Sequence, residues 1–454
     1  MVTFSMQKTT AFLTGPLTLF LGLSLFGQVS PGPRQQSEVE RPSFPGLAKL
    51  TASDGGENNE FGYAVSTTGN VVVVGAPYAT VGGHRAQGAV YVFKKPSSGW
   101  QDMSQAAKLT ASDGEGNAFF GSSVSMSGDT IVVGADGASV HSSLSQGAAY
   151  VFVQPASGWA DMIETAKLVA PDGAINSYFG SSVSISGDTV VIGADGANVG
   201  TDNFAGAVYV FVKAARGWTT ATQPSAKLTA SDGSKGNQLG YSVAIYGDTV
   251  IAGARSALVG TNPRQGAAYL FVKPAGGWKA MTETAKLTAA DGSTNSQFGY
   301  SVSIDGDVVV VGAPSRDSAG AAYLFARPNS GWTTTSSWTA KMMAGDGAIG
   351  GQFGYALSIG NGGVLVGAPS SKVSADAHPG AVCEFTKPGD TWIGKIAENE
   401  KLIPSNSGPE ERFGSSVSFK ADTWVAGAPY ATIGSKQYEG AAYVVDKPFL
   451  IEKP

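Results

Sequence analysis

Residues 61–77 read FGYAVSTTGNVVVVGAP, and this stretch decides the fold. It begins with a Phe-Gly pair, continues through two short runs rich in Val and Ser, and ends in Gly-Ala-Pro. The pair recurs at intervals of 55 to 60 residues, and its seven copies begin at Phe61, Phe120, Phe179, Leu239 (in place of Phe), Phe298, Phe353 and Phe413. Self-similarity at a fixed period predicts a repeat architecture in which each unit buries its apolar faces against its neighbours.

Each repeat unit is predicted to form four short strands. The runs are rich in β-branched and aromatic residues and are bounded by Gly, Asp, Asn and Pro, which favours strands over helices. A Gly-Asp pair such as Gly306-Asp307 fits the tight turn of a hairpin between the first two strands. The second strand, for example residues 308–311, is apolar at every position, so both of its faces must be covered. Each unit is therefore predicted to be a four-stranded antiparallel sheet that lies between two others.

The two ends of the repeat array predict a closed ring. A strand that carries Ala-Lys-Leu precedes the first Phe-Gly pair at residues 48–52, and no copy follows the last sheet, which ends at residues 440–445. The first copy can supply the missing outer strand of the seventh sheet, and this closure removes exposed sheet edges. We predict an all-β, seven-bladed β-propeller over residues 47–448, closed by the N-terminal strand and followed by a C-terminal tail at residues 449–454.

The composition excludes several classes of function. With 62 glycines and 14% charged residues among 454, the chain is glycine-rich and globular rather than disordered. A net charge of −5 without a basic domain argues against nucleic acid as a partner. Cys383 is the sole cysteine and there are three histidines, which excludes internal disulfides and Cys-based metal clusters. We expect a monomer that binds no metal and no other cofactor.

The first thirty residues have the features of an export signal. Lys8 is the only charged residue before an apolar stretch at residues 11–26, which is too short to span a bilayer as a helix. Residues 31–46 mix Pro, Gln and Ser and are predicted to be a flexible linker. We therefore expect a secreted, cell-surface or periplasmic protein with a signal peptide at residues 1–30 and no membrane span after its cleavage.

The recurrent Phe-Gly and Gly-Ala-Pro sequences resemble the FG-GAP repeat of integrin α-chain head domains and their secreted bacterial relatives. The resemblance covers about residues 47–447. It implies a seven-bladed propeller and, from the characterised relatives, extracellular recognition and cell adhesion. The chain departs from the pattern where Asp136, Asp195 and Arg255 replace the Pro of Gly-Ala-Pro, and where Leu239 replaces the Phe of the fourth unit.

The resemblance also raises the possibility of calcium, because integrin-type blades often hold the ion in an Asp-x-Asp-x-Asp-Gly loop between the first two strands. Here that connection is only a tight Gly-Asp turn, and Asp305-Gly306-Asp307 stops short of the motif. The calcium sites are therefore not carried over to this chain. A second set of acids, in recurrent Asp-Gly pairs, is interpreted as turn residues at Asp54, Asp113, Asp172, Asp232, Asp291 and Asp346.

Binding is predicted on the loops that connect the second and third strands. These are the longest and most variable connections in most units, and they share one face of the propeller with the connections between blades. The loop of unit five, residues 315–319, is shorter and predicts a notch in the rim. The candidate contact residues of this loop face are His84, Arg85, His141, Asn203, Phe204, Arg255, Arg264, Arg316, Asp317, His378, Lys436 and Tyr438.

No catalytic motif emerges from the sequence. A Gly-x-Gly-x-x-Gly sequence at residues 345–350 lacks the following helix of a dinucleotide site and is attributed to chance in a glycine-rich chain. Cys383 takes the place of a recurrent third-strand Tyr, which predicts a buried and inert thiol. Glu384 beside it requires either a partner or an exposed position.

Three functional hypotheses follow. The leading one is an exported, non-catalytic recognition or adhesion module that binds an extracellular protein or glycan through the loop face. The second is a propeller-type glycan-active enzyme, which a pair of carboxylates facing the central channel would favour. The third is a structural protein of the cell envelope that associates with itself.

Overall fold

The computed structural model describes residues 47–346, 350–372, 377–389, 391–405 and 407–447. The predicted signal peptide at residues 1–30, the linker at residues 31–46 and the tail at residues 449–454 lie outside the described residues.

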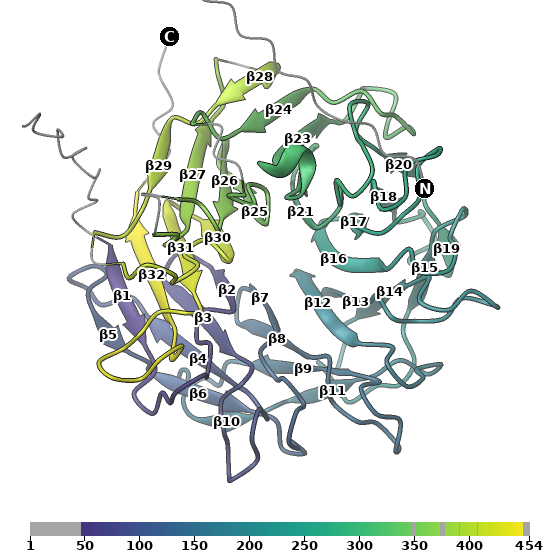
Figure 1. Cartoon of the computed structure of the whole chain (residues 1–454). Coiled ribbons are helices and arrows are strands. Elements are labelled where there is room, and N and C mark those ends of the chain that lie inside the picture. The colour runs from purple at the N-terminus through teal and green to yellow at the C-terminus, as the bar shows by residue number, and fades with distance from the viewer. Residues whose placement is uncertain (1–46, 347–349, 373–376, 390, 406, 448–454) are drawn as a thin grey trace, which may run out of the picture. The chain divides into compact units, whose positions relative to one another are not determined.

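Seven β-sheets surround a central axis, which confirms the predicted seven-bladed propeller (Figure 1). The blades are numbered here in chain order, and their strands are given from the axis outward. Blade 1 contains β2 (Ala64–Thr67), β3 (Val71–Ala76), β4 (Ala89–Lys94), β6 (Ala107–Thr110) and β10 (Met162–Ile163). Blade 2 contains β7 (Ser123–Ser127), β8 (Thr130–Ala135), β9 (Ala148–Val153) and β11 (Ala166–Leu168). Blade 3 contains β12 (Phe179–Ser186), β13 (Thr189–Ala194), β14 (Ala207–Val212), β15 (Ala226–Thr229) and β19 (Met281–Thr282).

The remaining four blades follow the same order. Blade 4 contains β16 (Leu239–Tyr246), β17 (Thr249–Ala254), β18 (Ala267–Val272) and β20 (Ala285–Leu287). Blade 5 contains β21 (Ser301–Asp305), β22 (Val308–Ala313), β23 (Ala321–Ala326), β24 (Ala340–Met343) and β28 (Gly394–Ala397), with a 3₁₀ turn η1 (Arg316–Ser318) in its loop. Blade 6 contains β25 (Ala356–Gly360), β26 (Gly363–Ala368), β27 (Ala381–Thr386) and β29 (Glu400–Leu402). Blade 7 contains β30 (Ser416–Lys420), β31 (Thr423–Ala428), β32 (Ala441–Asp446), β1 (Ala48–Thr51) and β5 (Met103–Ser104).

The N-terminal strand closes the ring as predicted. Strand β1 pairs antiparallel with β32, so that residues 48–50 lie beside residues 442–444. The backbone N–H of Phe61 donates to the carbonyl of Glu439 at 2.9 Å. At the junction of blades 1 and 2, the N–H of Phe120 donates to the carbonyl of Gln87 at the same distance. The seventh junction is therefore built like the others, although its two sides are far apart in the sequence.

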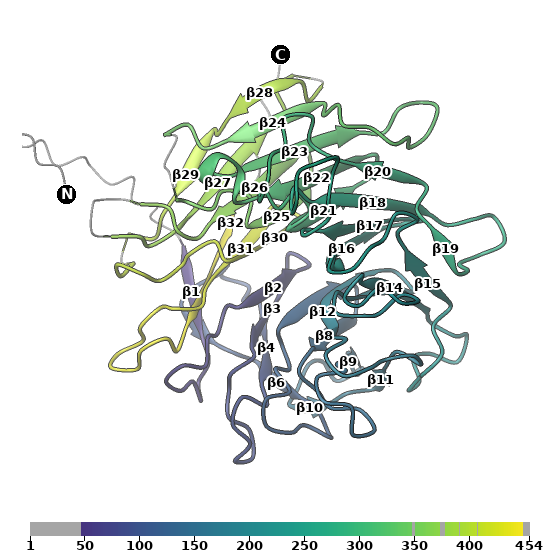
Figure 2. The ribbon, with the colours of Figure 1, turned by 45° about the vertical axis from the view of Figure 1, so that its right-hand side comes forward.

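Four blades carry a fifth, outermost strand that the sequence analysis did not predict. These strands, β5, β10, β19 and β28, lie between the third and fourth strands of one unit but pair parallel with the outer strand of the preceding blade. Three of them have only two residues. Such short segments show no alternation of apolar and polar residues, so no sequence pattern marks them. Figure 2 shows the neighbouring sheets in an oblique view.

Glycine allows neighbouring blades to touch through their backbones near the axis. A β-carbon added at Gly75, in the Gly-Ala-Pro of blade 1, would overlap the carbonyl oxygen of Gly121, in the Phe-Gly pair of blade 2. Gly121 itself has a φ of +94°, which L-residues with side chains rarely adopt. The same contact recurs at every junction, including that of Gly427 with Gly62 where the ring closes. This explains why the two glycines recur together.

The apolar cores lie between adjacent blades. One cluster combines Val90 and Val92 of β4 with Ile131 and Val133 of β8. The Phe of the Phe-Gly pair packs edge-on against aromatic residues of the third strand: the Phe120 ring centre lies 5.4 Å from that of Tyr150 and 5.9 Å from that of Phe152. These recurrent aromatic residues are buried in the core.

The recurrent Asp-Gly acids lie in turns, as predicted, but they also form ion pairs between blades. Lys341 of β24 contacts Asp291 at 2.6 Å, Tyr323 donates its hydroxyl to the same carboxylate at 3.0 Å, and the ammonium lies 5.1 Å from the Tyr323 ring centre. Burial by itself would raise the pKa of Asp291, but these contacts outweigh it and hold the pKa below its usual value. Equivalent pairs join Lys108 to Asp54, Lys167 to Asp113, Lys227 to Asp172, Lys286 to Asp232, and Lys401 to Asp346.

Both unusual residues of blade 6 have a structural explanation. Cys383 is fully buried, as predicted, and burial raises the pKa of its thiol to about 12, which disfavours the reactive thiolate. Glu384 is also buried, and Lys447 pairs with it at 2.6 Å. Of the two alternatives, a partner or an exposed position, the structure shows the partner.

The glycine contact yields a test of stability. Gly253→Ala introduces a methyl group against the carbonyl of Gly299 at a position whose φ is permitted for Ala, so the effect is steric. We expect thermal or urea unfolding to show a loss of about 1–3 kcal/mol, which is typical of overpacking. Gly276→Ala, which meets no atom within 4 Å, is the matched control and should stay within about 0.5 kcal/mol of the wild type. Equal stability of the two variants would contradict the role given to the backbone contact.

Candidate functional site

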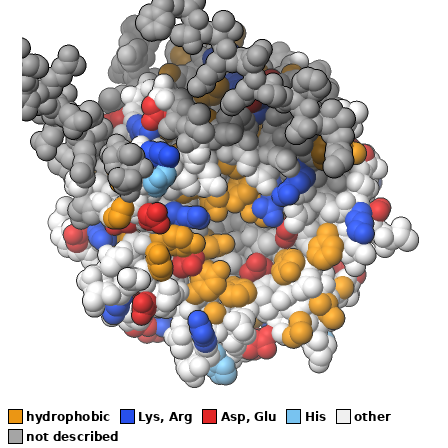
Figure 3. Space-filling model, in the orientation of Figure 1, with side chains coloured by type: hydrophobic (Ala, Val, Ile, Leu, Met, Phe, Trp, Pro, Cys, Tyr) orange, Lys and Arg blue, Asp and Glu red, His pale blue; other side chains and the backbone are white. Residues whose placement is uncertain are grey.

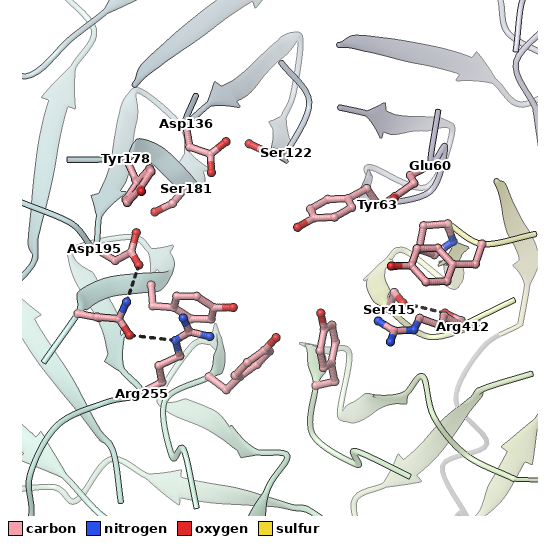
Figure 4. A pocket seen from close by; sticks show the side chains of 16 residues that line it. Glu60, Tyr63, Ser122, Asp136, Tyr178, Ser181, Asp195, Arg255, Arg412 and Ser415 are labelled. Atoms are coloured by element: carbon pink, nitrogen blue, oxygen red, sulfur yellow. Dashed lines mark hydrogen bonds between the residues drawn. The ribbon is translucent and has the colours of Figure 1, made fainter. Parts of the chain in front are cut away.

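A pocket of about 410 Å³ lies at the axis, on the face that carries the loops between second and third strands (Figure 4). We call it the axial pocket. In Figure 3 the same face is hollowed at its centre, and side chains coloured as hydrophobic, a class that includes Tyr, gather around the hollow. The volume falls within the range of small-molecule sites, about 300–1,000 Å³.

The Phe-Gly turn places one or two side chains of each unit in the axial pocket. In blade 1 the N–H of Tyr63 donates to the carbonyl of Glu60 at 3.1 Å, which makes residues 60–63 a four-residue turn with Phe-Gly at its centre. The Gly has a φ of +95°, as the third position of a type II turn requires. The Phe enters the core, while the first and last residues of the turn line the pocket. The equivalent hydrogen bond occurs in every blade.

A third position at the axis is the residue after Gly-Ala, which ends the second strand. Four units have the Pro of the repeat there, whereas blades 2, 3 and 4 have Asp136, Asp195 and Arg255. All three of these residues line the axial pocket. The three departures at the Pro position of Gly-Ala-Pro therefore meet in one hollow.

Aromatic rings line one side of the pocket. Tyr241, Tyr300 and Tyr355 follow the Phe-Gly positions of blades 4, 5 and 6, and their neighbouring ring centres lie 5.1 and 4.8 Å apart. We call these three residues the tyrosine arc. The guanidinium carbon of Arg255 lies 3.6 Å from the Tyr241 ring centre, a distance typical of stacking. Burial raises the pKa of Tyr300 above its usual value, so this phenol is uncharged at neutral pH.

Blades 2 and 3 form an acidic side. Each presents a Ser after Phe-Gly and an Asp after Gly-Ala, which gives Ser122 with Asp136 and Ser181 with Asp195. We call these the Ser–Asp pairs. Asp195 is only 7% exposed, and burial raises its pKa to about 6. Burial also raises the pKa of Asp136.

The charges of the pocket are held apart rather than joined in direct ion pairs. Arg255 Nε donates to Gln238 Oε1 at 3.2 Å, and Gln238 Nε2 donates to Asp195 Oδ2 at 3.4 Å, so an amide separates the two charges. On the opposite side burial raises the pKa of Glu60 to about 7, and the charge of nearby Arg412 opposes this rise. The pocket thus offers carboxylates, guanidinium groups and phenols together.

The predicted contact residues lie mostly on the rim. Arg255 is the one of the twelve that lines the axial pocket, and Tyr438 lines a second hollow of about 340 Å³ beside Tyr430. Arg316 and Lys436 are engaged within the chain, with Asp291 at 3.4 Å and with the Gly55 carbonyl at 2.5 Å. His378 is half-buried, and the remaining candidates are exposed on the loops: His84, Arg85, His141, Asn203, Phe204, Arg264 and Asp317.

Sequence reasoning missed most of the axial pocket. Four of its six tyrosines follow Phe-Gly, and of its acids only Asp136 and Asp195 were recorded, as departures from the repeat. The available signal was that the residue after the Phe-Gly pair is Tyr in some units and Ser in others. Among the residues that the structure describes, no group of three or more His, Cys, Asp or Glu side chains is placed to hold a metal ion.

Comparisons with known proteins agree with the fold. The sequence model of the FG-GAP repeat family matches residues 46–93, 103–152, 162–211, 223–271, 281–325 and 396–445. No matched segment covers β25, β26 or β27 of blade 6, which nevertheless fold like their counterparts. The structure is similar to the crystal structure of the WD40 β-propeller domain of Doa1, with a TM-score of 0.50 and 10% sequence identity. That match covers 89% of this chain and 97% of that chain, and at this identity it shows the fold alone.

Two other comparisons complete the description. No protein with a curated description matches this sequence. Within the described residues, no helix has the length and apolar character needed to cross a membrane.

The raised pKa of Asp195 predicts a pH-dependent stability. A carboxyl group whose pKa is higher in the folded state stabilises the protein at low pH, and this contribution is lost as the pH rises through about 6. Asp195→Asn cannot ionise, so its stability relative to the wild type should rise by about 1–3 kcal/mol between pH 4 and pH 8. Urea unfolding at both pH values measures this difference. Glu57→Gln, a substitution at an exposed acid, is the control. If the stability difference between Asp195→Asn and the wild type were the same at both pH values, the raised pKa would be excluded.

Proposed function

The chain belongs to the FG-GAP repeat family, and we propose that it is an exported recognition module that binds a glycan, without turnover, in the axial pocket. Membership in this family suggests a binding or recognition module. The apolar segment at residues 11–26 supports export to the cell surface or the medium, where adhesion through glycans takes place.

The observation that carries the proposal is that the tyrosine arc and the Ser–Asp pairs line one hollow. Figure 4 shows the Ser–Asp pairs on its wall. Sugars combine apolar C–H faces, which pack on aromatic rings, with hydroxyl groups that hydrogen-bond to carboxylates and guanidinium groups. The arc supplies the first kind of contact, and Asp136, Asp195 and Arg255 supply the second. A ligand with only apolar faces, or with only hydrogen-bonding groups, would leave part of the pocket without complementary contacts.

The form of the pocket favours a small rigid ligand over a broad protein surface. Stable protein interfaces bury about 800 Å² on each partner around an apolar core. The large exposed apolar residues of this protein are dispersed over several blades, as Leu144, Phe204 and Ile393 illustrate. By contrast, a pocket of about 410 Å³ accommodates about one or two sugar rings.

The test is a glycan array followed by isothermal titration calorimetry with the best oligosaccharide. Tyr300→Ala removes the central ring of the arc and should weaken binding at least about tenfold. Tyr246→Ala is the matched control, because Tyr246 is an exposed Tyr at the far end of β16 and does not line the pocket. Circular dichroism and melting temperature confirm that both variants are folded. Absence of any glycan ligand, or equal affinity of Tyr300→Ala and the wild type, would contradict the proposal.

A glycan-active enzyme is the second candidate, and a specific observation favours it. Asp136 and Asp195 lie on adjacent blades and both line the axial pocket, which is the arrangement of paired carboxylates that this alternative requires. A carboxyl group whose pKa is raised to about 6 is suited to act as a general acid.

Turnover distinguishes the two candidates. The bound oligosaccharide is incubated with the protein at pH 5 to 7, and new reducing ends and unsaturated products are measured over a day. The recognition proposal expects neither product. Products that disappear in Asp136→Asn or Asp195→Asn would establish the enzyme in its place.

A further inference from the structure

The second hollow, of about 340 Å³, is continuous with the wall of the axial pocket. It is lined by residues 408–411, which lead from β29 of blade 6 into blade 7, and by four residues of the loop between β31 and β32. We call it the rim hollow. Tyr430 lines both the axial pocket and the rim hollow. The two hollows therefore lie side by side and share one aromatic side chain.

Tyr430 stands at a position where most blades have a small residue. It is the first residue of the loop after the second strand, and blades 2 to 6 have Gly137, Gly196, Ser256, Ser315 and Ser370 there. A β-carbon at either glycine would overlap a carbonyl oxygen. Each serine donates its hydroxyl at 2.7 Å to the Gln that begins the Phe-Gly turn of its own blade. Because five blades fold with a small residue at this position, the fold does not require the Tyr of blade 7.

Tyr430 contacts one residue of each hollow. The guanidinium carbon of Arg412, which lines the axial pocket, lies 4.8 Å from the Tyr430 ring centre. The ring centre of Tyr438, which lines the rim hollow, lies 5.1 Å from that of Tyr430, with the two planes inclined at 61°. Tyr438 is 40% exposed although it is a large aromatic residue. The contacts with Arg412 and Tyr438 fix the Tyr430 ring at the boundary between the hollows.

The rim hollow offers the same kinds of contact as the axial pocket. The rings of Tyr430 and Tyr438 supply aromatic surface, while Glu410, Thr432 and Gln437 add an exposed carboxylate, hydroxyl and amide. Aromatic faces combined with hydrogen-bonding groups match the apolar and hydroxylated sides of a sugar ring. One kind of ligand unit therefore fits both hollows.

We propose that the two hollows are successive subsites of one groove, so that the ligand is a linear oligosaccharide that runs from the axis across Tyr430 to the rim of blade 7. This inference rests on the proposed function. Figure 4 shows Glu60, Arg412 and Ser415 together on the side of the axial pocket opposite Asp195, and the chain leaves the pocket on this side. Each hollow has room for about one or two sugar rings, so the groove holds about three or four.

Joining two subsites predicts a dependence of affinity on chain length. A unit in the rim hollow binds at the high effective concentration set by the unit already held at the axis, so each adds to the affinity of the other. A disaccharide fills the axial pocket alone, whereas a tetrasaccharide reaches both hollows. The gain should end once the rim is reached, because further units extend into solvent.

The experiment measures chain length against affinity by calorimetry at pH 7 with the full chain. The probes are cello-, manno-, malto- and N-acetylchito-oligosaccharides of two, three, four and six units, together with the homologous series of any further glycan that binds on the array. We expect the tetrasaccharide of the recognised series to bind at least about tenfold more tightly than its disaccharide, and the hexasaccharide to bind no tighter than the tetrasaccharide.

Variants at the rim assign this gain to the rim hollow. Tyr438→Ala should remove the gain and leave the affinity for the disaccharide unchanged, whereas Tyr438→Phe keeps the ring and should keep the gain. Tyr246→Ala, at a Tyr of similar exposure outside both hollows, is the matched control and should change neither affinity. Tyr300→Ala should weaken binding of every length. Melting temperatures verify that each variant is folded.

The outcomes separate the groove from the proposed function. If no oligosaccharide and no glycan of the array binds, the proposed function is wrong and the groove falls with it. If disaccharides bind in the axial pocket and longer chains bind no tighter, the groove alone is wrong. A gain with length that persists in Tyr438→Ala would also overturn it, because the chain would then leave the pocket over another blade.

Discussion

Neighbouring blades meet through their backbones near the axis, where the glycine of Gly-Ala in one blade touches the glycine of Phe-Gly in the next. No side chain fits between them, so the distance between blades is fixed by backbone contact and is the same around the ring. The contact of Gly427 with Gly62 shows that the first and last blades meet by the same rule. Closure is therefore a repetition of the ordinary junction, with β1 adding the outer strand that the seventh blade would otherwise lack.

The same turn that sets this contact also creates the site. Because the Phe enters the core and the Gly touches the next blade, only the two flanking residues of the four-residue turn are free to vary without disturbing the fold. They lie at the axis, as Glu60 and Tyr63 do in blade 1. The repeat thus fixes seven equivalent positions around a channel, and the individual units decide which chemistry each position carries. A symmetric scaffold acquires an asymmetric pocket, with tyrosines in blades 4 to 6 and Ser–Asp pairs in blades 2 and 3.

The features that are repeated seven times were predictable from the sequence, whereas those made by different units together were not. The strands, the Gly-Asp turns and the closure follow from patterns within a unit and from the count of units. The axial pocket requires residues as distant as Tyr63 and Tyr430 to meet, and their proximity exists only once the ring is closed. Asp136, Asp195 and Arg255 stood out as departures from the repeat. A departure in the sequence does not indicate which residues lie close together in the structure. The interpretation of Asp291 and its counterparts as turn residues was incomplete, because their Lys partners lie one unit further along the chain.

The way in which the pocket holds its own charges favours recognition of a ligand over a purely structural role. A structural site would be expected to join Arg255 and Asp195 in a direct ion pair, since a buried carboxylate is costly when it lacks a partner. Instead, Arg255 is stacked on Tyr241 and reaches Asp195 only through Gln238, while no basic group is among those that shift the pKa of Asp136. The folded protein therefore retains unsatisfied electrostatic interactions in a preformed hollow. Such preorganised groups gain their full stabilisation only when a complementary ligand displaces water and completes them.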